Sequence, residues 1–304
     1  MISVVIPTHN RDELLKKALK SIQDQTYQNF EVIVIDDVGN LSTKNLVKQL
    51  NDNRFTYIHN NQHQGAPYSR NLGIKMAKGK YIAFLDDDDE FMPNKLEEVN
   101  KHIEKNPEID VFYHQAIINM VNENIRYKSK PKFYNDQEEL YKALLIKNII
   151  GGTSMIIAKK ESLIKVGLFD VYLDSLQDYE LWLRLAKKGY KFKLIEQALT
   201  KYYYRTMSQY ISKDIQSNSK SIQIITNKYI DDISSLSKHN LKLRDDWINR
   251  MIVHKALLNG QIFFAFSTQL KYFFKTFKIK DFLIALSLLA GSKNIFKLKA
   301  RFNK

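Results

Sequence analysis

Residues 81–90 place a continuous apolar run directly before five acidic side chains, and this feature restricts the possible folds more than any other. The run Tyr81–Leu85 has no charged residue, which is typical of a short strand buried on both faces of a sheet. Carboxylates this close together repel one another, which raises their pKa values and costs stability. A solvated acidic turn before a helix would explain them. The favoured interpretation is a site for Mg²⁺ or Mn²⁺, which prefer carboxylate oxygens.

Similar apolar runs alternate with helical patterns over the first hundred residues. Strands are expected at 3–7, 30–35, 54–58 and 80–85, and helices at 13–25, 42–50, 67–77 and 93–105. Asp12 is a plausible N-cap of the first helix, and Gly65 is expected to open a loop before the third. Repeated β–α units favour an α/β fold, a mainly parallel sheet with helices on both faces.

Two of these strands end in acidic pairs, Asp36-Asp37 and the run that starts at Asp86. The topology places both at the rim formed by the carboxyl ends of the strands, where ligands bind in open α/β sheets. No Gly-x-Gly-x-x-Gly follows the first strand, and there is no Walker A lysine loop. The sequence therefore argues against a dinucleotide dehydrogenase and a P-loop enzyme.

The second half of the chain continues with an apolar segment at 109–120, a hairpin-like polar stretch to Lys132 and a helix at 136–147. A Gly151-Gly152 turn precedes a strand at 155–158, and a further strand is expected at 191–204. Between them, residues 177–185 have helical spacing. Asp178 lies in the first turn of that helix, where an anionic side chain favours the helix dipole, so capping alone would explain it.

Six segments, in order over residues 1–205, resemble family 2 glycosyltransferases of the GT-A fold. They are Val5–Arg11, Val34–Asp37, Gly65 with Ser69–Ile74, Gly79–Asp89, Val166–Asp170 and Gln177–Arg184. The resemblance implies a Rossmann-like catalytic domain at 1–205, with a nucleotide-sugar half to about 110 and an acceptor half at 111–205. Residues 206–304 carry no such signature and read as a basic, mostly helical C-terminal region.

The resemblance also implies a nucleotide-diphosphate sugar donor, with a UDP-sugar favoured. The implied donor-binding residues are Pro7, Thr8, His9, Asn10, Arg11, Asp37, Gly65, Arg70, Asp86 and Asp87. Of these, His9 is expected to stack on the base and Asp37 to accept a hydrogen bond from a base N–H. Arg70 would place positive charge near the diphosphate, or else form a structural salt bridge to the acidic rim.

The implied metal motif is Asp86-x-Asp88, where Asp88 binds Mn²⁺ or Mg²⁺ directly and Asp86 contacts the ribose or the metal shell. Asp178 matches the general base of an inverting, single-displacement reaction on a hydroxyl of a glycan or lipid-linked acceptor. Gly152, Gln177 and Trp182 are expected in the donor and acceptor pocket.

Three positions depart from the family pattern. Gln177 stands where a Glu usually precedes the base, and Asp87 stands where a small residue is common. Tyr204-Arg205-Thr206-Met207 replaces the usual Tyr-Arg-x-His, so a histidine contact to metal or diphosphate is not expected.

The net charge is +14, and residues 206–304 contribute +11 of it. Aromatic residues alternate with lysines there, but the longest uncharged run, 256–270, has 15 residues, too few to span a bilayer. We expect peripheral attachment to an anionic membrane surface. Packing on the catalytic core or formation of a homo-oligomer is the alternative, and the two are not exclusive.

The absence of cysteine fits a reducing compartment. The resemblance implies the bacterial cytoplasm, at the inner face of the membrane, and a role in surface polysaccharide synthesis. The alternative is a sugar-nucleotide nucleotidyltransferase. Enzymes of that class have a Gly-rich loop near the N-terminus, and this sequence lacks it. A third hypothesis is a binding module whose basic C-terminal region binds nucleic acid. The sequence contains no nucleic-acid-binding motif that supports it.

Overall fold

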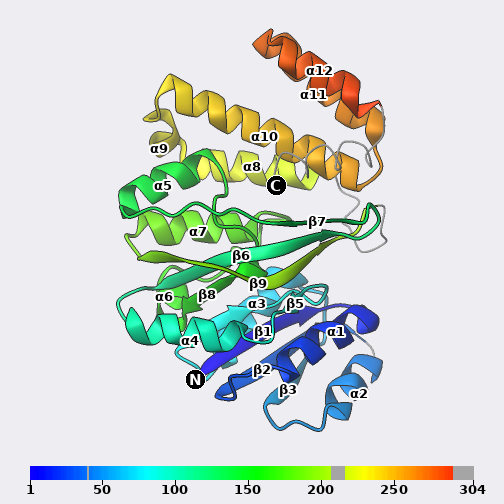
Figure 1. Ribbon diagram of the computed structural model, residues 1–304, viewed down its shortest axis with the longest axis vertical. Helices are drawn as coiled ribbons and strands as arrows, with labels where there is room; N and C mark the ends of the chain where they lie inside the picture. The colour runs from blue at the N-terminus through cyan, green and yellow to red at the C-terminus, as the bar shows by residue number, and fades with distance from the viewer. Residues whose placement is uncertain (40, 207–215, 290–304) are drawn as a thin grey trace.

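The computed structural model describes residues 1–39, 41–206 and 216–289 (Figure 1). Within them, one sheet runs in the order β3-β2-β1-β4-β8-β6-β9-β5, with β7 paired to β6. The strands are β1 Ile2–Thr8, β2 Phe30–Asp37, β3 Phe55–Asn60, β4 Tyr81–Phe84, β5 Glu90–Phe91, β6 Val111–Met120, β7 Ile125–Lys128, β8 Ile156–Lys159 and β9 Phe192–Tyr204. The mixed sheet with helices on both faces confirms the α/β expectation.

The first four strands in the sheet order, β3, β2, β1 and β4, are all parallel. β8 then runs antiparallel to β4, with Ala83 opposite Ile157. The amino end of β8 therefore lies at the rim where β4 ends. This reversal brings the short 3₁₀ helix Thr153–Met155, which directly precedes β8, beside the acidic run.

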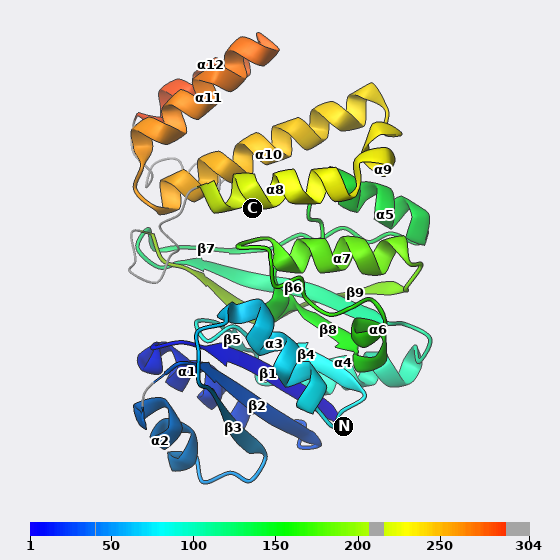
Figure 2. The ribbon, with the colours of Figure 1, turned by 180° about the vertical axis from the view of Figure 1, so that it is seen from behind.

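Helices cover both faces of the sheet (Figures 1 and 2). They are α1 Asp12–Gln23, α2 Leu41–Gln49, α3 Gly65–Met76, α4 Lys95–Lys105, α5 Gln137–Ile146, α6 Lys160–Lys165 and α7 Gln177–Lys187. Alternate residues of the central strands enter different cores: Val4 and Ile6 pack with α1, while Val5 packs with α3 and α7. The continuous apolar strands are therefore buried on both sides, as their sequence predicts.

Helix α3 packs unusually close to β1 because of a glycine. A Cβ atom on Gly73 would lie 2.4 Å from a Val5 methyl carbon, which is closer than real atoms approach. The glycine in the sequence segment Ser69–Ile74 thus sets the distance between the helix and the sheet, and with it the position of the Arg70 side chain at the rim.

Two local expectations were wrong. Asp12 does not cap α1, because the N-cap is Arg11; the Asp12 carboxylate instead accepts hydrogen bonds from Ser42 and Thr43, which ties α1 to α2. Gly65 does not open a loop but is the first residue of α3, with a φ of +83° that favours glycine.

Within residues 216–289, five further helices follow the sheet, at the end of the molecule opposite the N-terminal half (Figure 1). They are α8 Gln216–Lys228, α9 Ile230–Ser234, α10 Lys238–Leu258, α11 Ile262–Thr276 and α12 Ile279–Leu288. Residues of α8 and α9 share the main hydrophobic core with α5 and α7, and the buried Arg244 of α10 donates to the Leu145 carbonyl. This region therefore packs on the preceding domain, which confirms the expectation that the C-terminal region packs on the catalytic core. None of the helices described here is long and apolar enough to cross a bilayer.

Candidate active site

The carboxyl ends of β1, β2 and β4 surround a hollow of about 390 Å³. Nine of the residues expected to bind donor or metal line it: Pro7, Thr8, His9, Arg11, Asp37, Arg70, Asp86, Asp87 and Asp88. His63, Ala66, Ser69 and Tyr202 complete the lining, and the sequence analysis did not single them out. The parallel sheet thus brings together four segments that are far apart in the sequence.

Alternate burial separates the four aspartates of the acidic run. Asp87 and Asp89 are buried, whereas Asp86 and Asp88 are partly exposed at the rim. Asp89 accepts a hydrogen bond from the Tyr203 backbone N–H, and the fully buried Lys95 ammonium lies near enough to interact with its charge. Two of the four carboxylates therefore support the loop, and the other two lie at the rim of the hollow.

Asp87 holds the first strand to the acidic run. Its carboxylate accepts a hydrogen bond from the Thr8 hydroxyl at 2.8 Å and pairs with the Arg11 guanidinium at 3.1 Å. Burial raises the pKa of Asp87, while Arg11 and Thr8 oppose that shift. Thr8 and Arg11 are thereby fixed in the wall of the hollow.

Asp86 is held from two sides. Arg70 donates to it at 2.6 Å, and the Thr153 hydroxyl lies 3.0 Å and 3.1 Å from its two oxygens. The backbone N–H of Asp86 donates to Ser154, the neighbour of Thr153. Arg70 therefore forms the salt bridge to the acidic rim that was one of its two expected roles, and it also lines the hollow.

Asp88 faces the hollow with little compensation of its charge. Burial raises its pKa, and the neighbouring Asp87 and Asp86 raise it further. The nearest cation is Arg11, 3.8 Å away, and Arg205 donates to the Asp88 backbone carbonyl rather than to its side chain. A cation beside Asp88 would thus relieve an unfavourable charge.

The described residues contain no cluster of three acidic or histidine side chains arranged to enclose a metal ion. Mg²⁺ and Mn²⁺ do not require one, because one or two protein carboxylates can hold them together with substrate phosphates and water. Asp88 and Asp86 supply such a donor set beside the hollow. These residues therefore fit a metal that arrives with a diphosphate.

Asp37 anchors the start of α3. Its carboxylate accepts hydrogen bonds from the backbone N–H groups of Gln64 and Gly65 and from Asn60, and these bonds lower its pKa against the effect of burial. His63 also contacts it, at 2.8 Å. The expected bond from a base N–H remains a prediction, and it would have to use the remaining lone pairs of this carboxylate.

His9 is exposed at the mouth of the hollow, and its ring lies 4.9 Å from the ring of His63. The expected stacking of His9 on a base stays a prediction, and His63 offers a second imidazole face. Asn10 is exposed beside His9 with a φ of +51°, and it does not line the hollow. His63 carries only a weak sequence signal, because a histidine just after a strand is common.

Asp178 does not line the hollow but lies beside Gly152, close enough to Arg70 and Asp86 for their charges to act on it. A Cβ atom on Gly152 would lie 3.4 Å from the Tyr202 ring and 3.9 Å from the Asp178 carboxylate, so the glycine leaves open the space between them. Burial raises the pKa of Asp178 to about 6, although the Tyr179 N–H and Arg70 oppose the shift. This carboxylate can accept a proton near neutral pH.

Gln177 and Trp182 form hydrogen bonds to loop carbonyls and do not line the hollow. Gln177 donates to the Leu173 carbonyl in the loop before α7. Trp182 is fully buried, and its indole N–H donates to the Gly151 carbonyl at 3.3 Å. The expectation that Trp182 lines the pocket was wrong, because the side chain is enclosed in the hydrophobic core, where it packs on Phe169. It supports the Gly151-Gly152 turn from behind.

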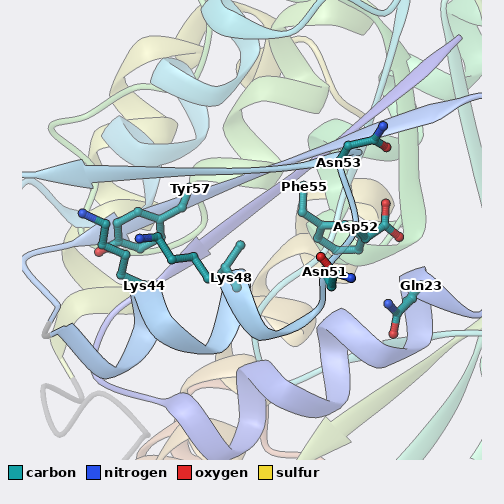
Figure 3. A pocket seen from close by; sticks show the side chains of 9 residues that line it. Gln23, Lys44, Lys48, Asn51, Asp52, Asn53, Phe55 and Tyr57 are labelled. Atoms are coloured by element: carbon teal, nitrogen blue, oxygen red, sulfur yellow. The ribbon is translucent and has the colours of Figure 1, made fainter.

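A second hollow, of about 810 Å³, lies along the edge strand β3 and helix α2 (Figure 3). Its polar side chains include Lys44, Lys48 and Asn51, and none of the expected site residues lines it. Tyr57 is its one link to the rim, because its hydroxyl donates to Asp36.

A hollow bounded by aspartates at the carboxyl end of a parallel sheet, with the Asp178 carboxylate close to the same rim, is the arrangement expected for a glycosyltransferase of the GT-A fold. The model of glycosyl transferase family 2 matches residues 3–166, and the chain belongs to this family. This decides against the nucleotidyltransferase alternative, and the protein is a glycosyltransferase.

Two relatives illustrate the match. An uncharacterized glycosyltransferase of Haemophilus influenzae is 34% identical over 304 residues, covering 98% of this chain and 99% of its own. The Escherichia coli protein WfgD, a UDP-Glc:α-D-GlcNAc-diphosphoundecaprenol β-1,3-glucosyltransferase, is 30% identical over 187 residues, covering 62% of this chain and 70% of its own.

Two solved structures share the fold. Staphylococcus aureus TarS 1–349 in complex with UDP-GlcNAc has a TM-score of 0.60 at 20% identity, over 82% of this chain and 72% of that one. The Pyrobaculum calidifontis mannosyltransferase PcManGT, in complex with GDP-Man and Mn²⁺, has a TM-score of 0.54 at 15% identity, over 100% of this chain and 87% of that one. At these identities the likeness establishes the GT-A fold alone.

Proposed function

We propose that this enzyme transfers a sugar from a UDP-sugar to a hydroxyl of a lipid-linked glycan in the synthesis of a bacterial surface polysaccharide. The observation that carries the proposal is the position of Asp178, beside Gly152 and close enough to Arg70 and Asp86 of the rim for their charges to act on its pKa. The donor and acceptor classes are supported by WfgD, whose name states both, and the donor class also by TarS, which binds UDP-GlcNAc.

The reaction is a single displacement. The acceptor hydroxyl gives its proton to Asp178 while its oxygen attacks the anomeric carbon of the donor. The bond between that carbon and the diphosphate oxygen breaks, and UDP leaves with the bonding electrons, so the configuration inverts. Arg11 and Arg70, held by Asp87 and Asp86, place fixed positive charge beside the leaving diphosphate.

The proposed cofactor is Mn²⁺ or Mg²⁺, held by Asp88 with Asp86 in support. When bound, the metal neutralises charge on the leaving diphosphate. The charge of Asp88, which Arg11 and Arg205 offset only in part, supports this assignment, as does the Mn²⁺ in the PcManGT complex.

Thermal unfolding in the presence of UDP, GDP, CDP or dTDP, each with Mn²⁺ or with chelator, tests the donor site. At about 100 times its dissociation constant a ligand stabilises the protein by roughly 2.7 kcal/mol, which raises the midpoint by several degrees. We expect this rise with UDP and Mn²⁺ and its loss with chelator. A larger rise with another nucleotide would overturn the UDP assignment, and a rise that persists in chelator would overturn the metal.

We further propose that α11 and α12 attach the enzyme to the anionic inner face of the bacterial membrane. These helices lie at the far end of the molecule (Figure 2) and leave large apolar side chains exposed, including Phe263 at 82%, Phe277 at 77% and Ile279 at 76%. Lys271, Lys278 and Lys280 lie in or between the same helices. Exposed aromatics beside lysines suit the interface of an anionic bilayer.

Co-sedimentation with vesicles checks this attachment. The protein is expected to pellet with phosphatidylglycerol vesicles at low salt, to be released by high salt, and to stay in solution with phosphatidylcholine vesicles. Replacing Phe263 and Phe277 by Ser should weaken pelleting, whereas Phe133→Ser, at an exposed phenylalanine before α5, should not. Equal pelleting of both variants would reject α11–α12 as the membrane surface.

A further inference from the structure

A row of basic side chains follows the edge of the sheet. Arg126 and Lys128 of β7, then Lys130 and Lys132 beyond its end, are all exposed, while Tyr127, Ser129 and Pro131 between them are half-buried. Side chains at every second position of an extended chain share one face. The sequence 126–132 therefore presents four cations on one side.

A hollow of about 260 Å³ lies at the end of this row. Residues 129–132 form one wall and residues 147–151 the other, so Lys130, Lys132 and Lys147 face a common space. Burial lowers the pKa of Lys147, and the charges of Lys132 and of Arg250 in α10 lower it further. Arg250 is therefore close enough to act on Lys147. We call Lys130, Lys132, Lys147 and Arg250 the basic cluster. They come from three separate parts of the chain.

The basic cluster lacks a carboxylate partner in the part of the chain that the structure describes. Among the residues that the structure describes, none of its four side chains lies within ion-pair distance of a carboxylate. By contrast, Lys142 on the preceding helix is 2.6 Å from Glu138. Cations that converge without an anionic partner repel one another, and a bound anion would relieve that repulsion.

The walls of the hollow are fixed by hydrogen bonds. The Tyr113 hydroxyl donates to the Lys132 carbonyl at 2.6 Å. On the opposite wall, the Asn148 side chain accepts from the N–H groups of Ile150 and Gly151. The hollow is thus a built feature of the fold.

The Gly151-Gly152 turn connects the hollow to the surroundings of Asp178. Gly151 lines the hollow, and the next residue, Gly152, borders the space in front of Asp178. A molecule whose hydroxyl reaches Asp178 past this turn can therefore place a neighbouring group in the hollow.

We propose that the basic cluster binds the diphosphate of the acceptor, so that the acceptor is a sugar carried on a diphosphate. The proposal rests on the transfer reaction argued above and adds the site that holds the acceptor. Lysine ammonium groups bind phosphate as point charges, and the adjoining row of cations would draw an anionic acceptor towards the cleft.

Basic residues on an edge strand also prevent pairing with other sheets. That role accounts for Arg126 and Lys128. It does not account for Lys147 and Arg250, which lie on no strand; the charges of Lys132 and Arg250 both act on Lys147.

Binding of farnesyl diphosphate to the full chain, with UDP and Mn²⁺ saturating the donor site, tests the proposal by calorimetry. The double variant Lys132→Gln/Lys147→Gln is expected to bind about tenfold more weakly than wild type, because two charge-assisted contacts are lost. Lys142→Gln is the matched control and should bind as wild type does. Both changes lie at exposed side chains, so the unfolding midpoints should agree within about 1 °C.

Equal affinity of wild type and the double variant, or no binding by wild type, would overturn the proposal. Phosphatidylglycerol vesicles distinguish the other source of phosphate. If the double variant loses vesicle binding but keeps farnesyl diphosphate binding, the basic cluster serves lipid headgroups and the proposal is wrong.

Turnover gives the second readout. The KM for a diphosphate-linked sugar acceptor should rise about tenfold in the double variant, with kcat within twofold, while the KM for the same sugar on a neutral alkyl chain stays unchanged. A KM that rises equally for both acceptors would contradict the assignment. Failure of UDP to bind would instead count against the transfer reaction, and the farnesyl diphosphate result would still stand by itself.

Discussion

Asp178→Asn is expected to lower kcat for sugar transfer by about 10³-fold, within the range of general-base catalysis. The amide has nearly the size of the carboxylate and can still accept the hydrogen bond from the Tyr179 N–H through its oxygen. The amide cannot take up the proton that the hydroxyl of the acceptor substrate gives up. Steady-state rates of UDP release with acceptor measure the loss, and the thermal shift with UDP should stay at the wild-type value.

The pH profile provides an independent check on this base. Because burial raises the pKa of Asp178 to about 6, the carboxylate is protonated below that pH, and kcat should fall towards acid and reach a plateau above about pH 7. Asp174→Asn, at an exposed aspartate just before α7, should retain the wild-type rate and profile. Transfer by Asp178→Asn within a few-fold of wild type would place the base elsewhere.

Asp88→Asn is expected to lower kcat by about 10²–10³-fold, the size of effect seen when one electrostatic contact to a developing charge is removed. The same variant should lose the part of the UDP thermal shift that depends on Mn²⁺. Without ligand its unfolding midpoint should stay the same or rise slightly, because the substitution removes repulsion from Asp86 and Asp87.

Asp24→Asn, at a surface aspartate paired only with Lys20, is the control for this variant and should behave as wild type in both assays. Near wild-type turnover of Asp88→Asn, with an unchanged response to chelator, would remove Asp88 from the metal site. Loss of turnover with a collapsed midpoint would instead show a structural role, which is why the midpoint is measured beside the rate.

The sequence predicted the parallel half of the sheet because its strands are local and regular. The runs in β1, β2 and β4 are apolar without interruption, and such runs are stable only when helices cover both faces. Since parallel strands end at one rim, Asp37 and Asp86 could be placed together before any contact was known.

The errors at Asp12, Gly65 and Trp182 have a common cause. Each residue has a local preference, for a cap, a loop or a site, and a tertiary contact outweighed it. Asp12 meets two hydroxyls of α2, Gly65 donates to Asp37 from β2, and Trp182 packs on Phe169. None of these partners lies close to its residue in the sequence.

By itself, the sequence determined the α/β class, the acidic rim and the family, because these depend on hydrophobic periodicity and on motifs contained in short segments. Only the tertiary structure decided how the four aspartates divide between support and site, and how Thr153 reaches Asp86. It also decided that Lys132 and Arg250 lie close enough to Lys147 for their charges to act on it. The physical reason is that charge repulsion and hydrogen bonding act through space, and the reversed strand β8 and the packing of α10 set those distances.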